Sequence, residues 1–552
     1  MSKREIYLGS TSLNDKNLAV KGEFISIQKE RYFKISNFNR MPDFFMTLVS
    51  DSDHWIFISS NGSLSAGRRN RDNALFPYYS DDKIHDYCGI TGSKTICLVE
   101  SKGRTSLWEP FSKQLAKIYR IERNLYKSVY GNQIIFEEIN HDLGLSFRYS
   151  WSNSEQFGFV KQSGITNITN EPVKVELLDG IRNILPSGID YIFQNEYSNL
   201  SDAYKKAELI EETGLGIFML SSIPVDRAEP SESLYATTVW SSGLVNSKIL
   251  ISDHQLAKFK QGFAVTTETD IRASRGAYYV NAELTLKKQQ TAEWMTVAEI
   301  NQSTTDVANL NLLLKNTPKI LSQVHKDIEA GTKRLVKIVA AADGLQTSNE
   351  ELCCVRHFTN TLFNVMRGGV YQDDYTLDSS DFRDFVNLTN TKISNDFKNT
   401  LDALPKKISN SDLIQLAEKK GNAHFIRICY EYLPLTFSRR HGDPSRPWNQ
   451  FSIDNKNEDG SPKLDFQGNW RDIFQNWEAL SVSYPGFIEN IISKFVNAST
   501  PDGYNPYRIM RSGIDWESPD PDDPWAYIGY WGDHQIIYLQ KLLELSDSYH
   551  PG

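Results

Sequence analysis

The first 300 residues carry short runs of β-branched and aromatic residues, separated by Asn, Gly and Ser. Such runs are typical of β-strands, and the residues between them are typical of turns. Helical periodicity is scarce in this part, although "FSKQLAKIYRIERNLY" (111–126) is compatible with one helix. Many strands joined by turns predict a large antiparallel β-sandwich over residues 1–302. Strands are expected in "HWIFISS", "KTICLVE", "QIIFEEI", "LSFRYSW", "VKVELLDGI", "LYATTVW", "KILISD", "GFAVTTETD" and "AYYVNAELTL".

The pattern changes near residue 303, where apolar residues take up helical spacing. Leu310, Leu313 and Leu314 lead the first helical run, within a predicted helical linker of residues 303–345. Residues 346–552 are expected to form an α-helical domain whose helices are joined by long polar loops. Its clearest helices are predicted in "NEELCCVRHFTNTLFNVMRGG", "NSDLIQLAEKKGN", "YPGFIENIISKFVNAS" and "GDHQIIYLQKLLELSDSY".

The last of these predicted helices is strongly amphipathic and lies close to the end of the sequence. A wide apolar stripe has to be buried against another element of structure. We therefore expect the sequence to be incomplete as a functional unit.

Length and composition narrow the class of protein. A chain of 552 residues is too long for one ordinary core, so two or three domains are expected. A net charge of -9 argues against a dedicated nucleic-acid binder or an anionic-membrane binder, and it suits a neutral, well-solvated substrate. Without an apolar leader or a run of about 18 apolar residues, no membrane partner is predicted. The five cysteines lack C-x-x-C spacing, which favours reduced thiols in a cytoplasmic protein.

Metal and nucleotide chemistry find little support in the sequence. The histidines lack H-x-x-x-H or H-E-x-x-H spacing, and no G-x-S-x-G, P-loop or dinucleotide fingerprint occurs. An acidic run near residue 520 leaves Ca²⁺ binding open as an alternative to an exposed turn, because hard cations take several carboxylate oxygens. Its members are Asp515, Glu517, Asp520, Asp522 and Asp523. Neither a metal nor a cofactor is predicted.

Two loops of the helical domain combine aromatic and charged residues in a way that points to sugar binding. They are "LTFSRRHGDPSRPWNQFSI" (435–453) and "GYNPYRIMRSGIDWESPDPDDPWAYIGYWGDHQ" (503–535). Aromatic rings cover the C–H face of a pyranose, while carboxylates and guanidinium groups hydrogen-bond its hydroxyls. The alternative is that the aromatic side chains are buried and merely anchor long loops.

The stretch "QGNWRDIFQNWEAL" (467–480) combines both possibilities within one predicted helix. If Asn469 caps that helix, Arg471 and Asp472 lie in its first turn, where the helix dipole also favours a carboxylate for structural reasons. Spacing divides the helix into two faces. The packing face carries Phe474, Trp477 and Leu480, and the polar face carries Arg471, Asp472, Gln475 and Asn476.

Two segments resemble motifs of the inverting disaccharide phosphorylases, the cellobiose and chitobiose phosphorylase family (glycoside hydrolase family ninety-four). "NWRDIFQN" (469–476) resembles the family's "GYRDQLQD"-type motif, and "SRPWNQFSI" (445–453) takes the place of the family's upstream Ser-Arg segment. "ISSNGSLSAGRRNRDNALFPYYSDDKIHD" (58–86) resembles a glycine-rich strand followed by "NSRxxxLTPWxND". The resemblance implies a β-supersandwich, a helical linker and an (α/α)6 toroid, in the order that the hydrophobic pattern predicts.

The resemblance also implies roles for matching residues. Arg471 and Asp472 match an Arg-Asp pair that holds the sugar on the non-reducing side of the cleaved bond. A carboxylate bonded to sugar hydroxyls can strengthen its contact as the ring flattens toward an oxocarbenium ion. Arg71 and Asp72 match a loop of the sandwich that closes over the site in that family.

The sequence departs from the family at the general acid, because its "DWND" motif is absent here. The phosphate-binding groups of the family would fall beyond Gly552, and a complete toroid takes about 350 residues. The resemblance therefore implies that the sequence is the N-terminal portion of a longer enzyme, or one partner of a split one. Glu517 is the best substitute acid, since the adjacent Trp516 is expected to desolvate it, and Asp515 is the next candidate.

These observations predict a protein that acts on the glycosidic bonds of a di- or oligosaccharide by an inverting mechanism, with inorganic phosphate or water as the attacking group. Inorganic phosphate is thus a possible co-substrate, and a homodimer or a complementary C-terminal chain is a possible partner. The alternative is a non-catalytic glycan-binding or scaffold subunit that keeps the sugar contacts and lacks the acid. Predicted catalytic residues are Glu517 and Asp515, and predicted substrate contacts are Trp470, Arg471, Asp472, Arg446, Trp448, Arg71, Asp72, Gln475, Trp516 and Asp533.

Overall fold

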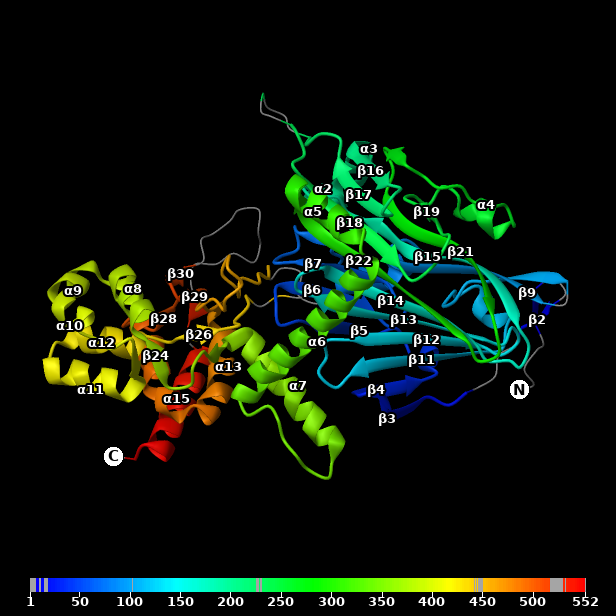
Figure 1. The fold of residues 1–552 in the computed structure, drawn as a ribbon. Helices are drawn as coiled ribbons and strands as arrows, with labels where there is room; N and C mark the ends of the chain where they lie inside the picture. The colour runs from blue at the N-terminus through cyan, green and yellow to red at the C-terminus, as the bar shows by residue number, and fades with distance from the viewer. Residues whose placement is uncertain are drawn as a thin grey trace. The chain divides into compact units, whose positions relative to one another are not determined.

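The computed structural model describes residues 6–8, 11–13, 18–101, 103–224, 228, 231–440, 442, 444, 450–516, 530–531 and 533–551. Contacts divide the chain into two compact units (Figure 1). Unit 1 comprises Met1–Lys333 and Pro444–Pro447, and unit 2 comprises Arg334–Asp443 and Trp448–Gly552. The expected order of a β part followed by an α part is confirmed, whereas the predicted boundaries at residues 302 and 345 stay predictions.

Unit 1 is built from antiparallel sheets, as the alternation of its strands predicts. Within the described residues its largest sheet has, in spatial order, β20 (Asp270–Arg272), β16 (Lys205–Ile210), β17 (Leu215–Leu220), β18 (Tyr235–Ser242), β22 (Thr291–Ser303), β14 (Gly158–Asn167), β13 (Leu145–Ser154), β12 (Ile134–Asn140), β11 (Ile121–Ser128), β4 (Glu30–Ser36) and β3 (Lys21–Ile27). A second sheet has β10 (Arg104–Trp108), β9 (Gly92–Ser101), β15 (Val173–Ile184), β21 (Gly276–Leu286) and β19 (Lys248–Leu250). A third has β5 (Phe45–Val49), β6 (His54–Ser59), β7 (Leu64–Arg68) and β8 (Ala74–Phe76).

The core of unit 1 lies between these sheets. One apolar cluster joins Phe147 of the largest sheet, Val175 of the second and Ile56 of the third, all of them buried. The outer face of the largest sheet is covered by α5 (Thr304–Leu314) and the first part of α6 (Thr317–Ala341), as in Figure 1. The short helix α4 (Leu256–Lys260) packs on the outer face of the second sheet. These helices therefore bury apolar side chains on the outer faces of the two larger sheets.

Two predicted elements of unit 1 differ in the structure. Residues 111–126 hold a single 3-10 turn (Leu115–Lys117), and their second half is strand β11 rather than a helix. That strand is hydrogen-bonded on both sides, to β12 and β4, and its Arg123 is buried beside Glu138. The segment "GFAVTTETD" (262–270) forms no regular strand until β20 begins at its last residue, although Glu268 and Thr269 each make one backbone hydrogen bond to a neighbouring strand. Both differences arise from long-range pairing, which local periodicity does not encode.

Unit 2 is mainly helical. Its elements include α7 (Glu351–Gly368), β26 (Leu435–Thr436), β27 (Gln467–Asn469), α13 (Trp470–Ser483), α14 (Ile488–Ala498), β28 (Tyr504–Asn505), β29 (Arg508–Met510), β30 (Gly513–Asp515), β31 (Tyr530–Trp531) and α15 (Asp533–Tyr549). The helices α7 and α13 are in close contact, because Gly368 lacks a side chain where Trp477 approaches. There the Trp477 indole Nε1 donates to the carbonyl of Gly368 at 2.8 Å. The complete toroid that the resemblance implies stays a prediction.

A group of short helices separates α7 from β26 in the sequence. They are α8 (Ser379–Thr389), α9 (Thr391–Asp396), α10 (Lys398–Asp402), α11 (Asn410–Lys420) and α12 (Ala423–Glu431). Two two-stranded sheets accompany them, β23 (Val370–Tyr371) with β26 and β24 (Thr376–Asp378) with β25 (Lys407–Ser409). Of these helices, the hydrophobic pattern predicts only α11. Three of the others, α8, α9 and α12, begin at an Asp or Asn cap, and α9 and α10 have only six and five residues, too few for helical periodicity to be detected.

We expect the N-cap of α8 to stabilise this helical group. The Asp378 carboxylate accepts from the backbone N–H groups of Ser380 (2.8 Å) and Asp381 (3.2 Å). Asp378→Ala should therefore cost about 1 kcal/mol and speed amide exchange in the first turn of α8, while Asp378→Asn keeps an acceptor and should cost less. Equal exchange in the wild type and both variants would contradict this role.

The same cap predicts a pH dependence. The hydroxyl of Ser380 and then the backbone amides that donate to Asp378 hold the pKa of its carboxyl below the usual value of 3.8. A carboxyl with a lowered pKa in the folded state contributes stability above its unfolded pKa and loses it as pH falls through the lowered value. The protection of the α8 amides, which is the intrinsic exchange rate divided by the observed rate at the same pH, should thus be constant near neutrality and fall only in acid below about pH 4, with Asp378→Ala removing that dependence.

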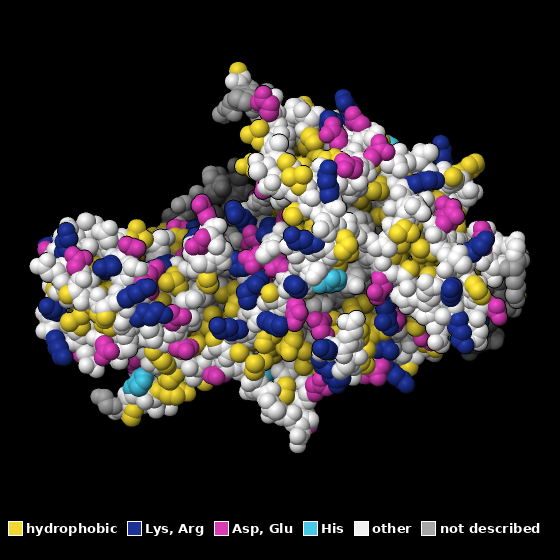
Figure 2. Space-filling view, viewed as in Figure 1, with side chains coloured by type: hydrophobic (Ala, Val, Ile, Leu, Met, Phe, Trp, Pro, Cys, Tyr) yellow, Lys and Arg dark blue, Asp and Glu magenta, His cyan; other side chains and the backbone are white. Residues whose placement is uncertain are grey.

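The surface carries both signs of charge. Lys and Arg side chains are interspersed with Asp and Glu over the face shown in Figure 2. No helix among the described residues is long and apolar enough to cross a membrane.

Candidate functional site

The start of α13 is fixed by a small antiparallel sheet in unit 2. Strand β27 pairs with β29, which places Asn469 opposite Arg508, and β29 pairs with β30. The backbone N–H of Trp470 donates to the carbonyl of Tyr507 at 2.9 Å. The first turn of the helix therefore lies beside the 503–516 segment, one of the two loops that the sequence selects for sugar binding.

The helix α13 divides into the two predicted faces except at Asn476, which was predicted on the polar face but is buried where α13 packs against α7, with its Nδ2 donating to Asn364 Oδ1 at 2.9 Å. On the packing face Phe474 and Trp477 are fully buried, and Leu480 is 4% exposed. On the polar face Arg471 and Gln475 are exposed, and Asp472 is half-buried. Within the described part of the chain, the side chains of Arg471 and Asp472 form no hydrogen bond or ion pair. A guanidinium and a carboxylate that adjoin without pairing are available to hydroxyl-bearing ligands.

Trp470 differs from its predicted role as a substrate contact. Its ring is 2% exposed and packs against Phe474 (centroids 4.9 Å apart) and Phe495 (5.2 Å). Because both faces of the indole are occupied by protein, the ring has no free face for a sugar. Trp470 therefore belongs to the core, in agreement with the alternative prediction that aromatic side chains of this region are buried rather than in contact with a sugar.

We expect Trp470→Phe to leave ligand affinity unchanged within about twofold. The indole Nε1 has no partner among the described residues, so the substitution removes no hydrogen bond, and the smaller ring should cost about 1–2 kcal/mol of stability. Titration of a bound sugar, together with thermal unfolding, measures both quantities. A loss of sugar affinity at unchanged stability would instead show that Trp470 contacts the sugar.

Cationic side chains that were not selected from the sequence adjoin the start of α13. Arg508 Nε donates to Asp515 Oδ2 at 2.9 Å, and its Nη2 contacts the same oxygen. Arg440 is hydrogen-bonded to Tyr507, and its guanidinium lies close enough to Arg508 for the two charges to interact. Burial lowers the pKa of Arg440, and the charge of Arg508 lowers it further. In the sequence, Arg440 and Arg508 could have been found because they lie in the two loops that combine aromatic and charged residues.

Of the two predicted acids, the structure describes Asp515 but not Glu517. Asp515 lies on β30 and is engaged by the Arg508 guanidinium, an arrangement that stabilises the β29–β30 hairpin. Glu517, Arg446 and Trp448 lie outside the described residues, as do Asp520, Asp522 and Asp523 of the suggested Ca²⁺ run. Asp533 begins α15, but its side chain is not described.

Trp516, a predicted substrate contact, is 41% exposed, so its ring is accessible. Among the described residues no group of three His, Cys, Asp or Glu side chains is placed to hold a metal.

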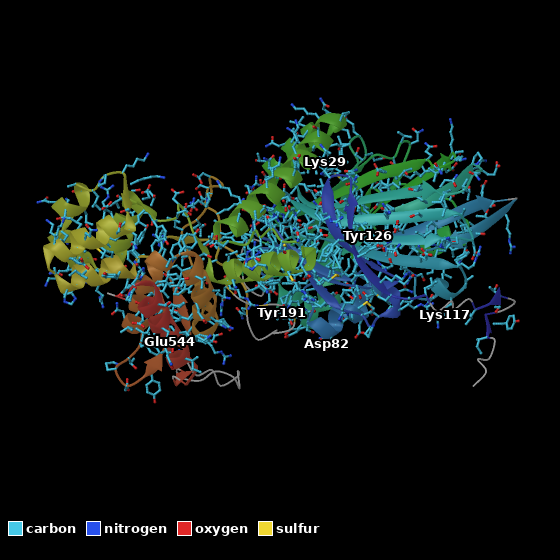
Figure 3. All side chains as sticks on the ribbon, turned by 90° about the horizontal axis from the view of Figure 1, so that it is seen from below. Lys29, Asp82, Lys117, Tyr126, Tyr191 and Glu544 are labelled. Atoms are coloured by element: carbon cyan, nitrogen blue, oxygen red, sulfur yellow. The ribbon has the colours of Figure 1, made fainter. Side chains whose placement is uncertain are left out.

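Arg71 and Asp72 lie in unit 1, on the loop after β7. Arg71 stacks over the ring of Tyr191, 4.3 Å from its centroid, and Asp72 Oδ1 accepts from the backbone N–H of Tyr191 at 3.0 Å. Tyr191 begins α2 (Tyr191–Glu196) and is labelled in Figure 3. Both side chains are thus engaged within unit 1. Their predicted convergence with Arg471 and Asp472 stays a prediction, because those residues belong to unit 2.

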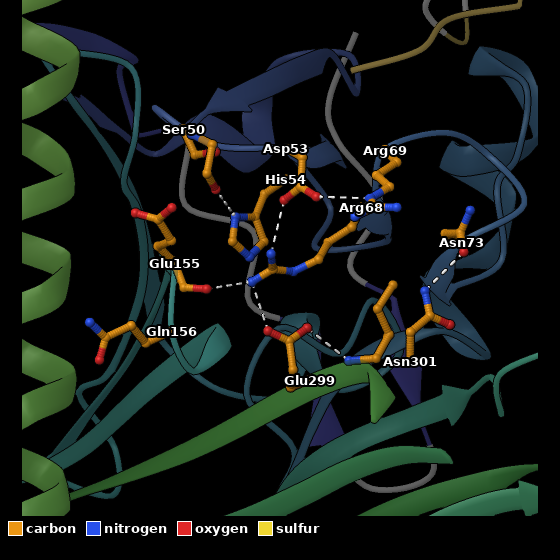
Figure 4. Close-up of polar contacts among 12 residues, drawn as sticks. Ser50, Asp53, His54, Arg68, Arg69, Asn73, Glu155, Gln156, Glu299 and Asn301 are labelled. Carbon is orange, nitrogen blue, oxygen red and sulfur yellow. Dashed lines mark hydrogen bonds and ion pairs between the residues drawn. The ribbon is translucent and has the colours of Figure 1, made fainter. Parts of the chain in front are cut away.

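The loop of Arg71 is anchored by a buried ion cluster at its base (Figure 4). Arg68 contacts Asp53 at 2.9 Å and Glu299 at 2.7 Å, and its Nη2 also donates to the carbonyl of Glu155 at 2.8 Å. At the far end of the loop, Asn301 Nδ2 donates to Asn73 Oδ1 at 2.9 Å. A loop tied down at both ends holds a fixed shape, which suits either a binding surface or a structural corner.

One protein-family model matches part of the chain. Residues 371–434 match glycoside hydrolase family 149 insertion domain 1. This range contains the helices α8 to α12, the group inserted between α7 and β26. The match supports a carbohydrate-active protein of the glycoside hydrolase or phosphorylase type, and not specifically the family ninety-four that the motifs resemble. No curated protein matches the sequence.

Several solved structures are remotely similar. A bacterial glucoamylase in complex with acarbose has 10% identity and a TM-score of 0.39, covering 92% of this chain and 65% of that protein. A putative kojibiose phosphorylase from the human microbiome has 10% identity and a TM-score of 0.23, covering 88% and 46%. An aldose epimerase homologue from C. elegans has 9% identity and a TM-score of 0.28, covering 48% and 100%. The chain therefore spans less than two thirds of the glucoamylase and about half of the phosphorylase.

Proposed function

We propose that the protein acts on the glycosidic bonds of a di- or oligosaccharide, with the start of α13 holding the sugar. The observation that carries this proposal is the polar face of α13. Its Arg471 and Asp472 lack partners within the described residues and match the Arg-Asp pair of inverting phosphorylases. The match of residues 371–434 to a glycoside hydrolase insertion domain supports the same class of substrate.

In the proposed mechanism one pair of residues binds the sugar and a separate acid protonates the leaving oxygen. The Asp472 carboxylate accepts hydrogen bonds from pyranose hydroxyls, and the Arg471 guanidinium donates to neighbouring oxygens. A carboxylic acid then protonates the leaving oxygen while phosphate or water attacks the opposite face of the ring. Glu517 remains the proposed acid. Asp515 is the weaker candidate, because its side chain is already engaged by Arg508. The two cations Arg440 and Arg508 suit a substrate or co-substrate with negative charge.

The test is incubation of the chain with a panel of disaccharides, with and without inorganic phosphate. We expect each disaccharide cleaved to give two products: a sugar 1-phosphate and a free sugar when phosphate attacks, or two free sugars when water attacks. Sugar binding without release of either product would instead favour the non-catalytic glycan-binding subunit. Neither binding nor release with any disaccharide of the panel would contradict the proposed substrate class.

A further inference from the structure

A cavity of about 370 Å³ opens in unit 1, away from the residues proposed to hold substrate. It adjoins a larger cavity of about 800 Å³, and the two share the lining residues Asn61, Phe111 and Lys113. Neither lining includes Arg71 or Asp72. Figure 3 shows Lys117, which lines the larger cavity, well apart from Tyr191 at the Arg71 loop.

Positive charge predominates in the smaller cavity. Lys94, Lys113, Lys260 and Arg182 line it together with one carboxylate, Glu109, and Lys113 pairs at 3.1 Å with Asp43, which lies outside this lining. Lys260 Nζ lies 2.8 Å from Glu109 Oε1, and Lys94 contacts Oε2 of the same side chain. Burial lowers the pKa of Lys94, and the charges of Lys260 and Arg182 add to this effect. With Lys113 paired to Asp43, three cations remain beside one anion, and they leave an excess of positive charge that a bound anion would neutralise.

Two buried polar atoms in the same lining lack hydrogen-bond partners among the described residues. They are the Nε of Arg182 and the Oγ of Ser93. Buried donors are nearly always paired, and an unpaired one costs about 1–3 kcal/mol. Arg182 makes only a long contact through Nη2, 3.4 Å from the carbonyl of Cys88. Two unsatisfied donors beside excess positive charge are the arrangement that an oxyanion completes.

The larger cavity supplies aromatic surface next to these charges. Phe38, Phe111 and Tyr119 line it, and Phe111 also lines the smaller cavity. Phe111 has a φ of 63°, a conformation that a bulky residue rarely adopts and that costs about 1–3 kcal/mol. Its backbone N–H is held there by Glu138 Oε2 at 2.7 Å, and this buried carboxylate also accepts from Trp108 and Arg123. The surroundings thus fix the Phe111 ring at the junction of the two cavities.

We propose that this pair of cavities is a second ligand site of the protein, for a saccharide that carries a negative charge. The anionic group, a phosphate ester or a carboxylate, lies among Lys94, Lys260 and Arg182 and accepts from Ser93. The pyranose ring extends toward Phe111 and Tyr119, which cover its C–H face. This site is independent of Arg471 and Asp472.

The test is calorimetric titration of the chain with glucose 1-phosphate, glucuronate, glucose and inorganic phosphate. We expect at least one of the two charged sugars to bind more tightly than glucose and more tightly than inorganic phosphate. The preferred one identifies the anion as a phosphate ester or a carboxylate. Lys260→Met should weaken that binding tenfold or more. Lys258→Met is the matched control, because Lys258 lies on the same helix, is exposed and does not line the cavity.

Several results would overturn the site. They are no binding of either charged sugar, equal binding of inorganic phosphate, or an equal loss in the Lys258→Met and Lys260→Met variants. Ser93→Ala removes one unpaired hydroxyl with little risk to folding and should also weaken binding. Asp472→Asn should leave this affinity unchanged, so failure of the second site is distinguishable from failure of the proposed function.

Discussion

Asp472→Asn is expected to abolish sugar turnover, or to weaken sugar binding by roughly 10- to 150-fold, while the fold survives. A hydrogen bond to a charged group contributes about 1.5–3 kcal/mol, and each 1.4 kcal/mol is about a factor of ten in affinity. The substitution keeps the shape of the side chain and replaces a carboxylate oxygen by an amide nitrogen. Steady-state kinetics and sugar titration measure the loss, and thermal unfolding shows whether the fold is intact.

The matched control is Glu478→Gln on the same helix. The Glu478 carboxylate faces Lys541 at 3.0 Å and lies outside the first turn of α13. An exposed ion pair contributes little, so turnover and stability should remain near those of the wild type. Unchanged rate and affinity in Asp472→Asn, or an equal loss in both variants, would show that the start of α13 does not hold the sugar.

Asp179→Ala is expected to destabilise unit 1 by about 3–5 kcal/mol, enough to unfold many domains. The Asp179 carboxylate is fully buried and contacts Lys161 Nζ at 2.7 and 2.8 Å. It also accepts from Thr95 (2.6 Å), Ser163 (3.0 Å) and Trp294 (2.7 Å). Removing it leaves a buried ammonium without its counter-charge and three donors without an acceptor.

Denaturant unfolding of Asp179→Ala measures this cost. Burial lowers the pKa of Lys161, and the Asp179 carboxylate opposes that shift. Because Asp179→Ala leaves the buried Lys161 ammonium unpaired, the double variant Asp179→Ala/Lys161→Met should recover part of the stability lost in Asp179→Ala. The control is Glu329→Ala, which removes an exposed pair with Lys333 at 2.7 Å and should leave the midpoint unchanged. A small effect of Asp179→Ala, similar to that of Glu329→Ala, would contradict the importance of the buried pair.

Elements with strong local periodicity could be predicted from the sequence. The strands β6, β9, β12, β13, β15, β18 and β21 and the helices α5, α6, α7, α11, α13, α14 and α15 all lie in segments selected by their hydrophobic pattern. The strand β11 could not be, because its buried Arg123 is satisfied by Glu138 of a neighbouring strand. A charged residue that finds its partner through the fold looks exposed in the sequence alone.

The candidate site shows the same limit. Spacing predicted the packing and polar faces of α13 correctly at Phe474, Trp477, Leu480 and Arg471. It did not predict that Trp470, in the first turn, is enclosed by Phe495 of α14. That contact depends on how α14 packs against α13. Trp470 was predicted as a substrate contact because it adjoins Arg471 and Asp472 in the motif that resembles a sugar-binding one. The pairing of Arg508 with Asp515 likewise depends on a hairpin that the sequence pattern did not reveal.

The most direct test of sugar binding at α13 is a crystal structure of the chain with a saturating disaccharide. The predicted result is a pyranose whose hydroxyls lie about 2.7–3.2 Å from the Asp472 carboxylate and the Arg471 guanidinium. A disaccharide bound elsewhere, with both of these side chains in solvent, would contradict the proposed function.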